Sequence, residues 1–113
     1  MKNLSKLEPS IRLSIEGPDN KGGSVFGPGI AALCLGVREI GSLNAAAKGM
    51  GMAYSKAWRI IKDTEAALGV LLLNRDGAHG STLTDEGNKL LDIHIELHDR
   101  LTEEAAKIYQ SLL

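Results

Sequence analysis

The stretch GSLNAAAKGMGMAYSKAWRIIKDTEAALG, residues 41–69, decides the fold that we expect of this 113-residue chain. Gly41 can end a preceding helix, and the side chain of Ser42 can cap the next one. Two helices are predicted beyond Ser42, over residues 43–48 and from residue 53 or 54 to residue 68, and the turn between them contains two glycines. Two helices joined by so short a glycine-bearing turn are typical of a helix-turn-helix motif.

The beginning of the chain predicts a hairpin. Residues 1–9 are expected to form a flexible leader. Apolar and polar residues alternate over residues 11–16, which indicates a half-buried strand. Residues 17–23 are rich in turn formers, and residues 24–26 are long enough for a short return strand. A β-hairpin is therefore predicted within residues 10–26.

A first helix is expected between this hairpin and Gly41. Pro28 suits the first helical position, where the backbone N–H has no helical partner, and the helix should run to about residue 40. Apolar residues recur at steps of three and four. They are Ile30, Leu33, Cys34, Val37 and Ile40. Because Cys34 lies on this stripe, we expect a buried and unreactive thiol.

The chain beyond Gly69 predicts a second hairpin and a long helix. The apolar run 71–73 and residues 81–83 read as two short strands, and the turn over residues 75–81 between them would form a wing. Thr84 can cap a last helix that continues to near Leu113.

Helix, short helix, turn, helix, hairpin and helix is the element order of a winged helix-turn-helix. We therefore expect a mainly α fold with a small β component, an N-terminal β-hairpin and a long C-terminal dimerisation helix. The expected organisation is a leader over residues 1–9, a winged helix-turn-helix DNA-binding domain over residues 10–84 and a dimerisation helix over residues 85–113.

Charge is distributed unevenly along the chain. The 13 Lys and Arg residues nearly balance the 14 Asp and Glu residues, and a net charge of −1 by itself argues against a nucleic-acid partner. However, residues 41–62 contain four bases and no acid, whereas residues 84–113 contain seven acids and three bases. A phosphate backbone meets the local field of one face rather than the sum. The basic stretch thus fits either a DNA-binding face or an ordinary solvated surface.

Several classes of protein are disfavoured by composition. A single cysteine excludes a disulfide scaffold and a Cys-based zinc site, and it suits a reducing, cytoplasmic compartment. No apolar run approaches the roughly 20 residues of a membrane span, and no secretory leader is recognisable, so no membrane partner is expected. We find no nucleophile–base pair, phosphate loop or metal cluster, and predict no catalytic residue, cofactor or metal. His94 and His98 lack a third ligand and are interpreted as surface or interface histidines.

The second helix of the motif should present its N-terminal residues to a major groove. Ser55 and Arg59 can contact bases or phosphates, while Lys48, Lys56 and Lys62 resemble phosphate anchors. The predicted DNA-binding residues are Ser42, Asn44, Lys48, Ala53, Tyr54, Ser55, Lys56, Trp58, Arg59, Lys62, Arg75 and His79. The alternatives are core packing for Tyr54 and Trp58, plain solvation for Arg59, and a salt bridge from Arg75 to Asp76 or Glu65.

An apolar stripe continues along the last helix further than the rest of the chain can cover. A two-fold homodimer through this helix is the natural solution. The predicted dimerisation residues are Leu90, Ile93, Leu97, Leu101 and Ile108. Such a dimer would hold two reading helices roughly 34 Å apart and predicts an inverted-repeat operator in double-stranded DNA.

The residues of the motif resemble a known family. Residues 41–48, 52–59 and 65–69 are similar to the N-terminal winged helix of ModE-type molybdate-responsive regulators, and FGPG at residues 26–29 is similar to their single-domain members. With Leu83, Thr84 and Gly87 added, the same core also resembles the DNA-binding domain of LysR-type regulators. The run YSKAW at residues 54–58 favours ModE over LysR.

This resemblance implies a prokaryotic, dimeric transcription regulator that reads DNA with residues 54–62 and uses residues 75–81 as its wing. ModE proteins carry molybdate-binding domains after this one, whereas the chain stops at Leu113, so no molybdate effector domain is expected. An effector could reside on a separate subunit. The wing is also less glycine-rich than is usual in that family.

A different class of function fits part of the pattern. The low net charge and the seven acids of the last helix would suit a winged-helix module that binds proteins and has lost DNA binding. Salt-dependent affinity for DNA separates the two hypotheses, since only a DNA-binding protein releases counterions from phosphates.

Overall fold

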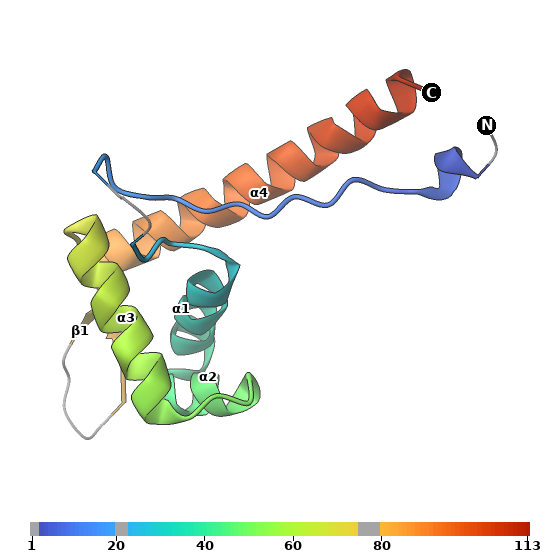
Figure 1. Cartoon of the computed structure of the whole chain (residues 1–113). Helices are drawn as coiled ribbons and strands as arrows, with labels where there is room; N and C mark the ends of the chain where they lie inside the picture. The colour runs from blue at the N-terminus through green and yellow to red at the C-terminus, as the bar shows by residue number, and fades with distance from the viewer. Residues whose placement is uncertain (1–2, 20–22, 75–79) are drawn as a thin grey trace.

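The computed structural model describes residues 3–19, 23–74 and 80–113. Its elements are the 3-10 helix η1 (Leu4–Lys6), α1 (Pro28–Ile40), α2 (Leu43–Gly49), α3 (Tyr54–Leu68), β1 (Leu73–Asn74), β2 (Thr82–Leu83) and α4 (Asp85–Ser111). The first three α-helices and the two short strands form a body from which α4 projects (Figure 1). The predicted fold, a mainly helical winged helix-turn-helix with a long last helix, is confirmed.

Helix bounds follow the glycine and proline residues that the sequence provides. Pro28 occupies the first turn of α1, and Gly41 ends it with φ of 80° and an N–H bond to the carbonyl of Val37. Gly69 ends α3 in the same way, with φ of 71° and a bond to the carbonyl of Glu65. A left-handed residue after a helix satisfies otherwise free carbonyls, and glycine adopts that conformation without strain.

The core lies where α1, α2 and α3 meet the wing strands and the first turns of α4. Leu33, Val37, Leu43, Ile61 and Leu91 are each at most 1% exposed. Cys34 is completely buried, which confirms its predicted place in the core, and desolvation raises the pKa of its thiol to about 12. Ile40, predicted on the same stripe, is 59% exposed because it is the last residue of α1.

Gly36 permits the close crossing of α1 and α2. A Cβ atom at this position would lie 2.6 Å from the Cβ of Ala46, well inside van der Waals contact. The pair of small residues therefore sets how closely the first two helices approach.

The wing strands pair in antiparallel fashion, with Leu73 opposite Leu83 and Asn74 opposite Thr82. Thr84 caps α4 as predicted, because its hydroxyl accepts a bond of 2.9 Å from the N–H of Gly87. Gly87 stands where a capping box would have Glu, and a Cβ there would overlap the carbonyl oxygen of Leu72. Close packing of the wing against α4 thus excludes the larger residue.

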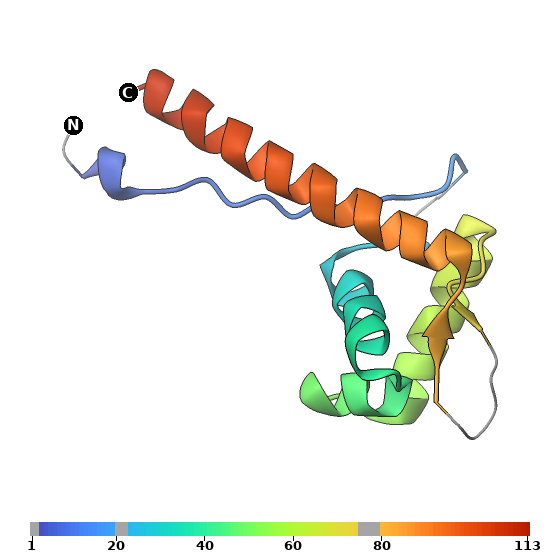
Figure 2. The ribbon, with the colours of Figure 1, turned by 180° about the vertical axis from the view of Figure 1, so that it is seen from behind.

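The predicted N-terminal hairpin is reduced in the described residues to one antiparallel bridge between Ile15 and Phe26. The two residues exchange both backbone hydrogen bonds, at 2.9 and 2.8 Å. The ladder stops there because the chain turns into α1 at Pro28, one residue beyond Gly27. Instead of pairing further, the preceding residues run extended beside α4, as both views show (Figures 1 and 2).

We call residues 4–15 the N-terminal arm. Its ends are tied to α4 by side chains: the Tyr109 hydroxyl donates to the carbonyl of Leu4 at 2.6 Å, and Nε2 of His94 lies 2.9 Å from the carbonyl of Leu13. Residues 4–6, expected within a flexible leader, form the 3-10 turn η1.

His94 corrects the interpretation of the two histidines. It is only 6% exposed and packs edge-on against Phe26, with 5.5 Å between the ring centroids, so it is a core residue of its own protomer. The sequence pattern failed here because the arm that buries His94 lies some 80 residues earlier in the chain. His98 is more exposed and lies 3.7 Å from the carboxylate of Asp99. No group of three or more potential metal-binding side chains occurs in the described part of the chain.

Candidate nucleic-acid interface

The turn between α2 and α3 is held by backbone bonds to the end of α2. The N–H groups of Met50 and Met52 both bond to the carbonyl of Ala47, at 3.0 and 2.9 Å, and Gly51 adopts a φ of 67°. This conformation favours glycine, so Gly51 allows α3 to start immediately after a sharp change of direction. The predicted helix-turn-helix is thereby formed, with α3 across the body (Figure 1).

One face of α3 is buried and the opposite face is open. Ala57, Ile61, Thr64 and Glu65 are buried, whereas Ile60 and Leu68, also predicted on the inner face, are half-buried. Five of the predicted DNA-binding residues at and beyond the start of α3 are exposed. They are Ala53, Tyr54, Ser55, Lys56 and Arg59. Ser55 and Arg59 are four residues apart and so lie one above the other on the side opposite Ala57.

Trp58 and Lys62 form the flank of this surface. Trp58 is half-buried against the core, which agrees with the alternative of a packing role. The ammonium of Lys62 lies 4.6 Å from the centroid of the Trp58 ring and 3.3 Å from a carboxylate oxygen of Glu65. Lys62 therefore has two intramolecular partners, whereas Lys56 and Arg59 have none among the described residues. Of the three, Lys56 and Arg59 are the freer cations.

Glu65 is a residue whose role the sequence pattern did not indicate. Its side chain is 5% exposed, and one carboxylate oxygen accepts bonds from the backbone N–H groups of Leu72 and Leu73, at 2.7 and 3.2 Å. One acceptor oxygen that two backbone amides share ties the two segments together. Glu65 thus fixes the base of the wing to the C-terminal half of α3.

The first N–H groups of a helix can bind a phosphate where they are free, but the start of α2 offers few such groups. The Ser42 hydroxyl accepts from the N–H of Ala45 at 3.1 Å, and the N–H of Leu43 donates to the Ser81 hydroxyl at 3.4 Å. Two of the N–H groups expected to face a phosphate are therefore satisfied within the chain. Asn44 and Lys48 are exposed at opposite ends of this short helix.

The wing itself is described only at its base. Asn74 donates from its side-chain amide to the Thr82 hydroxyl and to the carbonyl of Leu83, at 3.0 and 3.1 Å, and so closes the two-stranded ladder. Ser81 bonds from its N–H to the carbonyl of Gly41, which places the returning strand beside the start of α2. The two predicted wing contacts, Arg75 and His79, lie outside the described residues.

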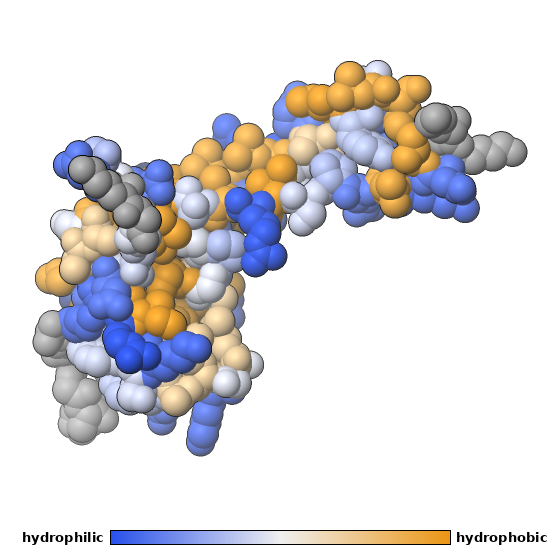
Figure 3. Space-filling view, viewed as in Figure 1, coloured by the Kyte–Doolittle hydropathy of each residue, from blue (hydrophilic) through white to orange (hydrophobic). Residues whose placement is uncertain are grey.

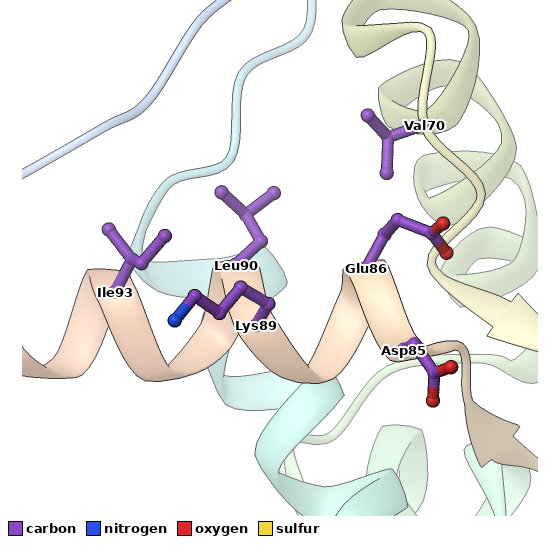
Figure 4. A pocket seen from close by; sticks show the side chains of 6 residues that line it. All are labelled: Val70, Asp85, Glu86, Lys89, Leu90 and Ile93. Carbon is purple, nitrogen blue, oxygen red and sulfur yellow. The ribbon is translucent and has the colours of Figure 1, made fainter.

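The residues predicted for dimerisation lie on one side of α4. Ile93, Leu97, Leu101 and Ile108 are between 40% and 49% exposed, whereas Leu90 is half-buried against the core. Hydrophobic side chains gather over the projecting part of α4 (Figure 3). At its base, Val70 faces Leu90 and Ile93 across an open pocket of about 380 Å³ that is rimmed by Glu86 and Lys89 (Figure 4). No helix in the described ranges has the length and apolar character to cross a bilayer.

Comparison with known proteins agrees with this geometry. A structure described as the CbnR DNA-binding domain in complex with DNA is 25% identical, has a TM-score of 0.60 and covers 74% of this chain and 94% of that one. VV2_1132, described as a LysR family transcriptional regulator, is 30% identical with a TM-score of 0.53, over 63% of this chain and 24% of its own. A search among curated proteins found no match.

Sequence comparison with protein families matches residues 32–88, which include the helix-turn-helix, the wing and the cap of α4. The matching family supports the LysR side of the resemblance and gives no support to the ModE side. The chain belongs to the bacterial regulatory helix-turn-helix proteins of the lysR family.

Proposed function

We propose that this protein is a sequence-specific DNA-binding transcriptional regulator that acts as a homodimer on an inverted-repeat operator. The observation that carries the proposal is the exposed first turn and a half of α3, where Ser55, Lys56 and Arg59 project from a helix whose other side is locked into the core. The related CbnR domain has been captured with DNA, and membership of the lysR family supports a regulatory rather than a catalytic role.

In this proposal the exposed residues of α3 make different kinds of contact with DNA. Arg59 has the planar fork that binds guanine or phosphate in two-pronged fashion, and Ser55 can bond to a base edge or a phosphate. Lys56 and Lys48 are point charges suited to the backbone of the two flanking strands. Lys62 plays a smaller part, since Trp58 and Glu65 already hold its ammonium. Tyr54, Ala53 and Asn44 complete the contact surface, and Arg75 and His79 supply the wing.

The dimer follows from the apolar stripe of α4. Isolated exposed apolar side chains are ordinary, but four at steps of four, four and seven along one helix form a continuous strip. A second copy that packs its own strip against this one removes both from water. The two bodies then lie at opposite ends of the helix pair and can present their α3 helices to successive turns of DNA.

The ModE-type resemblance remains a hypothesis that rests on residues 26–29, 41–48, 52–59 and 65–69, and the run YSKAW at residues 54–58 favours it over LysR. Bound molybdate would require oxyanion ligands, and the sequence suggests none within these 113 residues. An effector carried by a separate subunit is the remaining possibility. Pull-down with the dimer as bait would detect such a subunit.

The decisive experiment is selection of bound DNA from a random double-stranded pool. We expect an enriched inverted repeat, bound with an affinity that falls steeply as salt rises, because each phosphate contact releases a counterion. Failure to enrich any sequence, together with salt-independent retention of a protein partner, would replace this proposal by the protein-interaction module that the acids of α4 suggest.

A further inference from the structure

Beyond η1, the N-terminal arm is an extended chain with hydrogen bonds along only one of its edges. Ile15 exchanges both of its backbone bonds with Phe26, and the carbonyl of Leu13 is bonded to His94. Along an extended chain, successive residues direct their N–H and C=O groups to opposite edges. Over residues 7–15 the odd-numbered residues therefore direct their backbone groups to the body of their own protomer, and the even-numbered residues direct theirs to the other edge.

That other edge is unoccupied in the described part of the chain. Glu8, Ser10, Arg12 and Ser14 are all exposed, and neither their backbone groups nor their side chains bond to another described residue. Pro9 lacks an N–H but stands at an odd position, so it removes no donor from this edge. An uninterrupted edge of this kind is a template for another strand.

The position of the arm on α4 points this edge toward the proposed dimer partner. The arm contacts α4 through His94 and Tyr109. At 3.6 residues per turn, His94 lies about a sixth of a turn and Tyr109 about a third of a turn from the centre of the open stripe. On the other side of the arm, α1 is joined to α4 by Arg38, which bonds to Asn88 and to Asp92 at 2.8 Å. The arm thus lies between α1 and the stripe, with its even-numbered edge on the side of the stripe.

Two-fold symmetry then brings the two edges together. When the stripes of two α4 helices pair in antiparallel fashion, the two-fold axis is perpendicular to the helix pair, and both arms lie on the same side of it. Ser10 and its neighbours line a pocket together with Ile95 and His98, level with Leu97 at the middle of the stripe. A helix pair centred on Leu97 therefore places Ser10 beside the axis.

We propose that the arms of two subunits pair as an antiparallel β-ribbon centred on Ser10, which covers the α4 pair across the dimer axis. In this register Glu8 of each arm lies opposite Arg12 of the other, which forms two cross-strand ion pairs. In the helix pair centred on Leu97, Lys89 of each subunit lies near Glu104 of the other. The inference rests on the proposed α4 dimer, and it adds a part of the interface outside the residues shared with the lysR family.

Disulfide trapping tests the register. Cysteines introduced by Ser10→Cys would have Cα atoms about 5.5 Å apart, within the range of a disulfide. Ser14→Cys is the matched control, because it lies on the same edge, is equally exposed and would be about 27 Å from its symmetry mate at 3.4 Å per residue. Under mild oxidation we expect Ser10→Cys to form a covalent dimer at least tenfold faster than Ser14→Cys. The buried native Cys34 does not compete.

Charge exchange provides an independent measurement. Glu8→Arg and Arg12→Glu should each raise the dissociation constant of the dimer, measured by sedimentation, by about fivefold, and the double substitution should return it to within about twofold of the unsubstituted protein. Effects that simply add in the double variant would exclude the pairing of Glu8 with Arg12.

The outcomes separate this inference from the dimer on which it rests. If the unsubstituted protein sediments as a dimer but Ser10→Cys and Ser14→Cys cross-link equally, or neither cross-links, the arms are not paired and the α4 dimer stands. A protein that stays monomeric at tens of micromolar overturns both proposals.

Discussion

Helices α3 and α4 are both amphipathic, yet α3 buries most of its apolar face within one chain and α4 buries only the start of its own. Ala57, Ile61 and Thr64 of α3 are at most 1% exposed. On α4, Leu91 and His94 are buried near its start, but Leu97 and Leu101 further along are 40% and 43% exposed. The comparison separates two situations: folding of one chain leaves a polar side of α3 open, whereas it leaves an apolar strip of α4 exposed.

The largest expected effect comes from making the open face of α4 charged. Leu97→Glu combined with Leu101→Glu would place carboxylates in the dimer seam, so we expect dimerisation to weaken by about 100-fold or more, with the helical content unchanged. Sedimentation and circular dichroism measure the two quantities. Glu103→Gln, on the polar side of the same helix, is the control and should leave the dimer intact. A double variant that still dimerises like the parent protein would exclude this face.

The second largest effect is expected at Glu65, which ties the base of the wing to α3. Glu65→Ala leaves the buried N–H groups of Leu72 and Leu73 without their acceptor, and we expect the free energy of unfolding to fall by about 3 kcal/mol. Urea denaturation measures this loss. Glu104→Ala, which removes an exposed carboxylate from α4, should change stability by less than about 0.5 kcal/mol. Equal losses in the two variants would show that Glu65 does not tie the wing to α3.

The open face of α3 is tested by removal of its free cations. Arg59→Ala should weaken binding to the selected operator by about 10- to 100-fold, because a two-pronged contact is lost. Lys56→Ala should weaken all sequences alike and reduce the salt dependence by about one phosphate contact. Lys107→Ala lies far along α4 and serves as the control. If Arg59→Ala binds as tightly as the parent protein, α3 reads DNA through other residues.

The smallest effect is expected from the buried thiol of Cys34 in α1. Burial raises the pKa of Cys34 from 9.0 to about 12, so the folded state holds its proton more tightly than the unfolded chain. The stability contributed by this difference is present below pH 9 and lost as the pH rises from 9 towards 12. At pH 8 we expect a thiol reagent to modify the unfolded chain within minutes and the folded protein far more slowly. Fast labelling of the folded protein would contradict the burial of Cys34.

Local patterns in the sequence predicted most of the helical framework. Pro28, Gly41, Gly69 and Thr84 each act through their own backbone conformation or a bond three or four residues away, and the helix bounds they predicted are confirmed. The exposed face of α3 was predictable for the same reason, since the spacing of Ala57, Ile61 and Thr64 assigns its opposite side to solvent.

Other features could not be predicted because they depend on residues distant in sequence. A glutamate side chain would ordinarily be placed on the surface, yet the returning chain at Leu72 and Leu73 supplies two donors to that of Glu65. His94 and His98 have the same spacing as a surface pair, but the arm covers only the first of them. The hairpin within residues 10–26 was overpredicted, because alternation of polarity indicates a half-buried extended chain but does not specify what it lies against.

The sequence by itself determined where helices start and stop, which faces are apolar and where the positive charge gathers, because these properties arise within a few residues of one another. Only the tertiary structure decided that Lys62 is held by Trp58 and Glu65, that α2 begins with its amides largely satisfied, and that the arm follows α4 with one edge open. Each of these features depends on which partner a polar group meets after the chain has folded. The sequence does not specify that partner, because a polar group can bond equally well to water.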